Sequence, residues 1–224
     1  MNELDGNSQS VGGDQAASAD QPILSLIDAR VLGALMEKQL TTPDAYPLTL
    51  NSLTTACNQK TSREPVMSLS EGEVQQCLYD LQKRALVKFE YASRADKYDQ
   101  RLTREYHFDN AEQAIFCIML LRGPQTLNEL LARTRRMHEF SGHEGLQDLV
   151  NKLLSRTKPL LCRIAAASGQ REERYMHLFS GSIEAGEFGH SNSASENPES
   201  SSDELFARIE ELEKQVAWLM EHNK

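Results

Sequence analysis

Glutamine, lysine and arginine side chains recur where this sequence has helical or turn patterns, and these residue types suit contact with nucleic acid. Glutamine can form paired hydrogen bonds with adenine in the major groove, and lysine or arginine can neutralise backbone phosphates. The candidate contacts with double-stranded DNA are Lys60, Arg63, Gln75, Gln76, Gln82, Lys83, Arg94, Lys97, Arg101, Arg133, Arg135 and Arg136. The sequence therefore predicts a DNA-binding surface.

Two glutamates argue against that surface, because Glu71 and Glu73 occupy the start of the helix that carries most of the glutamines. Phosphates approach a helix at its N-terminal end, where these carboxylates would repel them. Alternatively, the glutamates cap the helix while the glutamines and basic residues form an ordinary solvated surface. A separate hypothesis is that the chain is an adaptor that binds another protein, because fold alone does not assign function. Both hypotheses remain open here: a DNA-binding or transcription-related regulator, and an adaptor.

Other chemistry finds little support in the motifs. The sequence has no glycine-rich phosphate loop, nucleophile elbow, pair of catalytic carboxylates or run of metal ligands. Its four cysteines, Cys57, Cys77, Cys117 and Cys162, stand singly without CxxC spacing, and the HEFSGHE stretch that begins at His138 lacks a known ligand spacing. We therefore expect a protein that is not an enzyme and has no cofactor, metal or disulfide.

The net charge of -9 is unfavourable for DNA binding, but the charge is unevenly distributed. Residues 1–23 hold four acidic and no basic residues, and residues 181–224 hold 10 acidic against 3 basic ones. Residues 24–109 hold 12 acidic against 11 basic residues and residues 110–180 hold 7 against 10, which leaves this central part at +2. Local charge governs the encounter with a polyanion, so a DNA-binding core between acidic ends is compatible with a negative net charge of the whole chain.

Three helices are predicted in the first part of the ordered chain. Apolar residues recur at helical spacing over residues 24–40, where a Thr-Thr-Pro sequence then ends the helix. Thr49 can cap a second helix that ends at Asn58, and Ser70 with Glu73 has the capping-box signature of a third. These boundaries depend on neighbouring residues alone.

A β-hairpin is predicted after the third helix. Residues 87–91 alternate between apolar and polar side chains, which is typical of a half-buried strand. Residues 94–99 would be the polar tip, and residues 102–108 alternate again and would supply the returning strand. The predicted order is helix, helix, helix, hairpin.

The same order recurs in the second part of the chain. TLNSL at residues 49–53 is matched by TLNEL at residues 126–130, and the apolar spacing of the third helix recurs in residues 146–153. Residues 160–164 and 173–179 would form the second hairpin. Three helices and a hairpin make a winged helix, so we predict a mainly α, α+β fold with two winged-helix units in tandem. The alternative is a generic small α+β domain used twice.

Five segments are expected: a disordered tail over 1–22, winged-helix units over 23–109 and 110–180, a flexible linker over 181–202 and a coiled-coil helix over 203–222. The seam of that helix, spaced alternately by four and three residues, would be Leu205, Ile209, Leu212, Val216 and Leu219. It predicts a homodimer, and the alternative is an amphipathic helix docked on its own domain. No stretch approaches roughly 18 consecutive apolar residues, so we expect a cytoplasmic protein without membrane contact.

Several motifs resemble the YceH-like family of uncharacterised bacterial proteins. They are YPLTLN at residues 46–51, ACNQK at 56–60 and REPV at 63–66, and the resemblance spans residues 23–181. It implies a tandem winged-helix fold in the bacterial cytosol and brings no catalytic residue, cofactor or settled target. The polar loop of residues 58–65 is the first place to look for function, because a turn between the second and third helices usually has about three or four residues.

Overall fold

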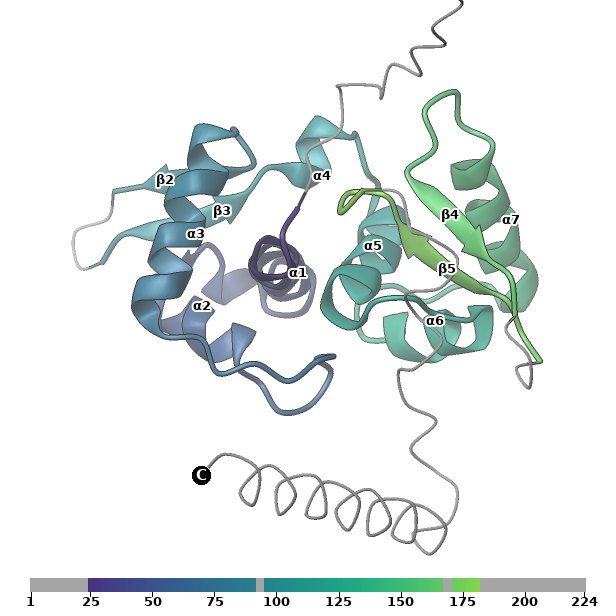
Figure 1. Ribbon diagram of the computed structural model, residues 1–224, viewed down its shortest axis with the longest axis horizontal. Helices are drawn as coiled ribbons and strands as arrows, with labels where there is room; N and C mark the ends of the chain where they lie inside the picture. The colour runs from purple at the N-terminus through teal and green to yellow at the C-terminus, as the bar shows by residue number, and fades with distance from the viewer. Residues whose placement is uncertain (1–23, 92–94, 167–170, 182–224) are drawn as a thin grey trace, which may run out of the picture. The chain divides into compact units, whose positions relative to one another are not determined.

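The computed structural model describes residues 24–91, 95–166 and 171–181. Within these ranges the chain forms helices and two small antiparallel sheets, in agreement with the predicted α+β class (Figure 1). The predicted N-terminal tail, the linker after Gly181 and the coiled-coil seam from Leu205 to Leu219 lie outside the described residues.

The first half of the described chain contains helices and a three-stranded sheet. Their bounds are α1 Leu26–Thr41, η1 Pro43–Ala45, β1 Leu48–Thr49, α2 Leu50–Cys57, α3 Glu71–Lys83, β2 Val87–Glu90, β3 Lys97–Gln100 and α4 Leu102–Glu105. The predicted cap Thr49 and the capping box of Ser70 and Glu73 are confirmed, because they bind backbone N–H groups at the helix starts. The predicted end of α2 at Asn58 is confirmed as well.

The hairpin of this half differs from the prediction. β3 pairs with β2 on one edge and with β1 on the other. This returning strand begins at Lys97, within the stretch of residues 94–99 that was predicted to be the polar tip. The prediction of a returning strand over residues 102–108 is wrong, since α4 begins at Leu102. The Leu102 side chain is fully buried, and the side-chain oxygen of Gln100 accepts a hydrogen bond from the Thr103 N–H at 3.0 Å. The strand therefore ends where the chain must turn into the core.

Three helices and a hairpin follow each other again in the second half. Their bounds are α5 Asn110–Arg122, α6 Leu127–Thr134, α7 His143–Leu154, β4 Leu161–Ile164 and β5 Arg174–His177. β4 and β5 are antiparallel, which confirms the predicted strands over residues 160–164 and 173–179. Thr126 caps α6 as Thr49 caps α2. The order predicted from the two TLN motifs is thus observed in both halves.

Helices α1 and α5 pack against each other and join the two halves (Figure 1). All residues from 28 to 37 and from 112 to 121 are buried, which is the pattern of helices covered on all sides. Gly33 permits the close approach, because a β-carbon there would lie 2.9 Å from Cγ of Leu121. One hydrophobic cluster spans both halves, and the predicted domain boundary near Asn110 stays a prediction.

Candidate nucleic-acid interface

The solvent side of α3 carries four of the predicted contacts, while its apolar side packs on α1 and α2. The four exposed residues are Gln75, Gln76, Gln82 and Lys83. Nε2 of Gln76 donates to Asp80 at 3.0 Å, and Nζ of Lys83 donates to the same carboxylate at 3.2 Å. Nζ of Lys83 also lies 4.0 Å from the centre of the Tyr79 ring, and Tyr79 is 56% exposed. This face is accessible and polar, but its lysine charge is already balanced.

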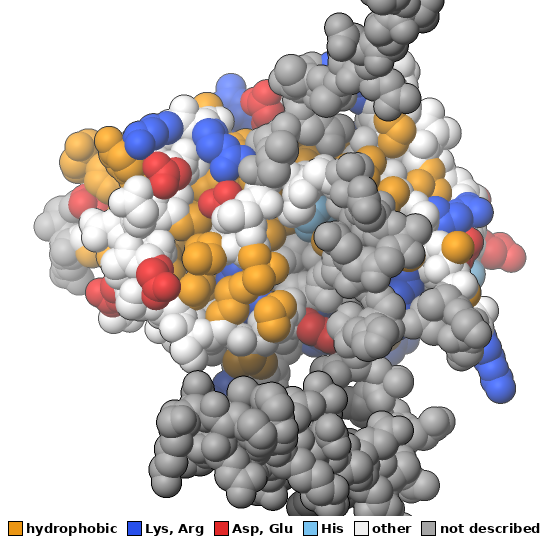
Figure 2. Space-filling view, in the orientation of Figure 1, with side chains coloured by type: hydrophobic (Ala, Val, Ile, Leu, Met, Phe, Trp, Pro, Cys, Tyr) orange, Lys and Arg blue, Asp and Glu red, His pale blue; other side chains and the backbone are white. Residues whose placement is uncertain are grey.

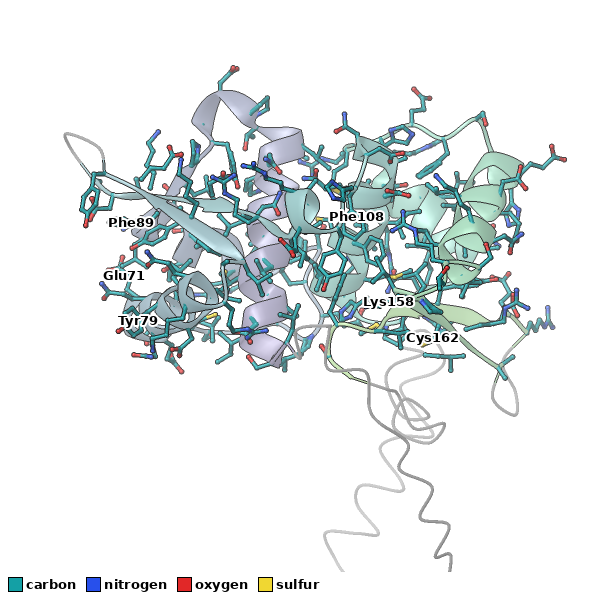
Figure 3. The ribbon with its side chains drawn as sticks, turned by 90° about the horizontal axis from the view of Figure 1, so that it is seen from above. Glu71, Tyr79, Phe89, Phe108, Lys158 and Cys162 are labelled. Carbon is teal, nitrogen blue, oxygen red and sulfur yellow. The ribbon has the colours of Figure 1, made fainter. Side chains whose placement is uncertain are left out.

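The N-terminal end of α3 does not suit an anion. The backbone N–H of Ser70 donates to Oε2 of Glu73 at 2.8 Å, and the Glu73 N–H donates to the Ser70 hydroxyl oxygen at 3.3 Å, so these donors are used. Hydrogen bonds from the side chain and backbone of Ser70 lower the pKa of the Glu73 carboxyl, which keeps it ionised. Glu71 is exposed at the same helix end (Figure 3). Two carboxylates therefore oppose the approach of phosphate there.

The hairpin of β2 and β3 combines balanced charges with exposed aromatic surface. Lys97 is half-buried, and Nε of Arg101 pairs with Asp99 at 3.6 Å. The predicted contact Arg94 lies outside the described residues. Tyr91 is 88% exposed, and Figure 2 shows hydrophobic side chains gathered at the outer end of this hairpin. This surface offers phosphate little net positive charge.

Arg63 is not a surface residue, so the prediction that it neutralises phosphate is wrong. Its side chain is 0% exposed, and its Nη2 lies 2.6 Å from Oε2 of Glu37 on α1. Its Nε donates to the Ala56 carbonyl at 3.0 Å. A positive charge that is enclosed and paired cannot reach DNA. Lys60 in the same loop is exposed and stays a candidate.

Arg30, which the sequence-based selection of site residues missed, holds the same loop from the buried side of α1. Arg30 is 1% exposed, and its Nη1 and Nη2 donate to the carbonyls of Cys57 and Pro65 at 3.1 and 2.5 Å. Burial lowers the pKa of the Arg30 guanidinium, and the charge of Arg63 lowers it further. Arg30 could have been identified from the sequence, because it is an arginine inside an otherwise apolar helical stretch. The loop of residues 58–65 is therefore anchored by two buried arginines, which is a structural role.

The second half presents basic side chains at the turn between α6 and α7. Arg135 and Arg136 directly follow the last residue of α6, and both are exposed. The third predicted residue, Arg133, pairs with Glu129 at 3.4 Å and donates a hydrogen bond to the Gln125 side chain. Arg135 and Arg136 form no ion pair with any part of the chain that the structure describes. Their charge is consequently available to a partner.

The start of α7 differs from the start of α3. Its N-cap is Gly142, at a φ of 114°, and the first backbone N–H groups receive no side-chain cap. Open N–H groups and the helix dipole favour an anion at such an end. A hollow of about 520 Å³ opens beside it, lined by Leu127, Asn128, His143, Ala165, Ala166, Arg171, Glu172 and Glu173. The open helix end and the two arginines thus belong to one segment, which consists of α6, α7 and the chain between them.

Metal or thiol chemistry is not indicated by the described parts of the chain. Residues 24–91, 95–166 and 171–181 contain no group of three His, Cys, Asp or Glu side chains that could hold a metal ion. Their four cysteines are unbridged, and burial raises the pKa of the Cys57 thiol to about 12, which is typical of a core residue. None of the described helices is long and apolar enough to cross a membrane.

The fold and surface define an α+β protein whose two halves share the order of three helices and a hairpin. Residues 24–170 match the family described as a protein of unknown function, DUF480, and the chain belongs to that family. It is 52% identical over 199 residues to a UPF0502 protein of Cellvibrio japonicus, covering 88% of this chain and 91% of the relative. It is 45% identical over 203 residues to the UPF0502 protein YceH of Salmonella paratyphi B, covering 88% and 92%. The resemblance to YceH-like proteins is confirmed.

Proposed function

We propose that this chain is a non-enzymatic tandem winged-helix protein of the cytoplasm that binds double-stranded DNA as a regulator. The repeated order of three helices and a hairpin supports the assignment, because the second and third helices of a winged helix form a helix-turn-helix and the hairpin is the wing. α2 with α3, and α6 with α7, would be the two helix-turn-helix segments.

The second half is the better DNA-binding unit, although most of the contacts predicted from the sequence lie in the first half. The observation that carries this choice is that Arg135 and Arg136, between α6 and α7, are exposed and form no ion pair within the described part of the chain. In a helix-turn-helix the first helix crosses the phosphate backbone and the start of the second enters the groove. The uncapped start of α7 can accept a phosphate, whereas Glu71 and Glu73 close the start of α3.

The difference in charge between the two halves also favours the second half as the DNA-binding unit. Residues 110–180 hold 7 acidic and 10 basic residues, whereas residues 24–109 hold 12 acidic and 11 basic ones. Phosphate contacts supply most of the sequence-independent affinity for DNA. The half with the excess of positive charge should therefore dominate binding.

Fluorescence anisotropy with a labelled duplex tests the proposal in the full chain. Replacing Arg135 and Arg136 with Ala should weaken binding and reduce the slope of log affinity against log salt by about 1.8, since each lost phosphate contact removes about 0.9. The matched control replaces Lys60 and Lys83 of the first half with Ala and should change binding less. Absence of binding by the wild-type chain would refute DNA binding, and a larger loss in the control would reassign the interface to the first half.

A protein-binding adaptor is the second candidate, and the first half supplies the observation that favours it. Tyr79 on α3 and Tyr91 after β2 are 56% and 88% exposed, and tyrosine is enriched at protein interfaces. Replacing both with Ser should leave the fold intact, because neither ring is buried. Crosslinking followed by mass spectrometry would then show partners lost specifically in this variant. Unchanged partners would remove this face from any protein interface.

A further inference from the structure

The outer edge of the sheet in the first half is formed by β2. The strand order is β1-β3-β2, so β3 is paired on both sides and β2 on one side, and no other described strand covers its free edge. Such an edge presents unpaired backbone N–H and C=O groups to which another strand can bind. We infer that this edge binds the same edge of a second copy of the chain, by antiparallel pairing of the two β2 strands. The contact goes beyond the proposed function and does not depend on DNA binding.

The backbone groups of Phe89 point toward the free edge. The Arg101 N–H donates to the Leu86 carbonyl at 2.8 Å, which makes these two residues a hydrogen-bonded pair of the antiparallel ladder. Such pairs recur at every second residue, so Lys88 and Glu90 direct their backbone groups to β3, while Phe89 directs its own away from β3. Two β2 strands can therefore exchange two hydrogen bonds at Phe89, with a twofold axis through that pair.

A pairing centred on Phe89 is complementary in charge. In this register Lys88 of each copy lies opposite Glu90 of the other, where facing α-carbons are about 4.5 Å apart. The two side chains are 49% and 39% exposed, and their charged atoms lie 2.7 Å apart within one chain. A lysine on a free edge usually opposes pairing, but here each lysine meets a glutamate, which stabilises an antiparallel pair. This self-complementarity identifies a second copy as the partner.

The opposite face of the same edge is aromatic. The centre of the Phe89 ring lies 4.5 Å from that of Tyr91 and 5.6 Å from that of Tyr98, and Tyr91 is 88% exposed. In the pair, Phe89 meets its own copy across the axis, and Tyr91 lies opposite Val87 of the other copy. Pairs of aromatic and β-branched residues stabilise antiparallel sheets. The pairing therefore covers aromatic surface that is exposed in the single chain (Figure 2).

The contact is weak by itself. It joins residues 87–91 of each copy, far fewer than the roughly 20–30 residues a side of a stable interface, so we expect a dissociation constant of about 0.1–1 mM. Association through this edge should be measurable at chain concentrations of about 0.2 mM and negligible at micromolar concentrations. At micromolar concentrations the predicted coiled-coil seam would be the element that holds two chains together.

Disulfide trapping with full-length variants tests the register. A mixture of Lys88→Cys and Glu90→Cys chains in a glutathione redox buffer should form a covalent dimer, because facing α-carbons lie within about 4.4–6.8 Å, the range that a disulfide spans. Each variant alone places its new thiols on a diagonal of about 7–8 Å and should form several-fold less dimer. A control mixture of Gln75→Cys and Gln82→Cys, both exposed on α3, should also form less. Equal yields in the mixture and the controls would overturn the pairing.

Sedimentation equilibrium of charge variants at low salt tests the complementarity. Lys88→Glu and Glu90→Lys should each weaken association by about threefold to tenfold, because like charges then face each other. A mixture of the two full-length variants should recover association, since opposite charges face each other again in the mixed pair. The predicted seam is the same in all three samples, so its contribution cancels. A mixture no heavier than the separate variants would overturn pairing with a second copy, whereas chains that pair but bind no DNA would refute only the proposed function.

Discussion

Replacing Arg63 with Met removes the partner of a carboxylate that is itself almost fully enclosed. The Arg63 side chain is 0% exposed and that of Glu37 is 10% exposed, and two hydrogen bonds of 2.6 and 3.3 Å join them. Breaking a buried ion pair by removing one partner costs about 3–5 kcal/mol. Nζ of Lys38 remains 3.3 Å from Glu37, so the loss of unfolding free energy should fall at the lower end, about 3 kcal/mol.

The pH dependence of this loss follows from the pKa of Glu37. Burial raises the pKa of the Glu37 carboxyl, but the hydrogen bonds and charges of Arg63 and Lys38 together outweigh burial and hold the pKa below its ordinary value. A carboxyl with a lowered folded pKa contributes stability that is present above the unfolded pKa and is lost as the pH falls through the folded pKa. In the variant only Lys38 opposes burial, so the pKa rises. The free-energy difference between wild type and variant should therefore be smaller at pH 4 than at pH 7.

Urea unfolding followed by circular dichroism measures these differences, since the described core is mainly helical. Lys60→Ala is the matched control, because Lys60 belongs to the same loop and is exposed. Its effect should stay within about 0.5 kcal/mol. A free energy of unfolding of Arg63→Met within about 1 kcal/mol of the wild-type value at pH 7 would refute the role of the buried pair. The same loss of unfolding free energy at both pH values would refute the role of Glu37 ionisation.

Three further predictions concern other parts of the chain. Gly33→Val should destabilise the protein by about 1–3 kcal/mol in thermal unfolding, because the new side chain overlaps Leu121 between α1 and α5; an unchanged midpoint would contradict that packing. Burial lowers the pKa of His177 from 6.5 to about 4, so stability should fall as the pH drops from 6.5 toward 4, and His177→Gln should flatten this slope in urea midpoints. Sedimentation should give a dimer for the full chain and a monomer for a chain ending at Ser180. The same number of chains per particle in both samples would exclude the coiled-coil seam as the dimerisation element.

Local signals in the sequence were sufficient for the elements that depend on neighbouring residues. The caps at Thr49 and Ser70 join groups three residues apart, so the starts of α2 and α3 could be predicted without knowledge of the fold. Apolar periodicity likewise predicted the order of helices and hairpins in both halves, although it placed the returning strand of the first hairpin over residues 102–108 and not at Lys97–Gln100. The excess of positive charge in residues 110–180 was also countable from the sequence. Each of these features is fixed by composition or by contacts within one turn of helix.

Only the tertiary structure decided which basic residues can meet a partner. Lys60 and Arg63 stand in one polar loop, yet Arg63 is buried because Glu37, 26 residues earlier, pairs with it. Likewise, β3 ends before Leu102 because that side chain enters the core, and the close packing at Gly33 depends on α5. Contacts between residues distant along the chain leave no local pattern, because the same polar loop or apolar helix could pack against many different partners. Their partners are determined only when the chain is folded.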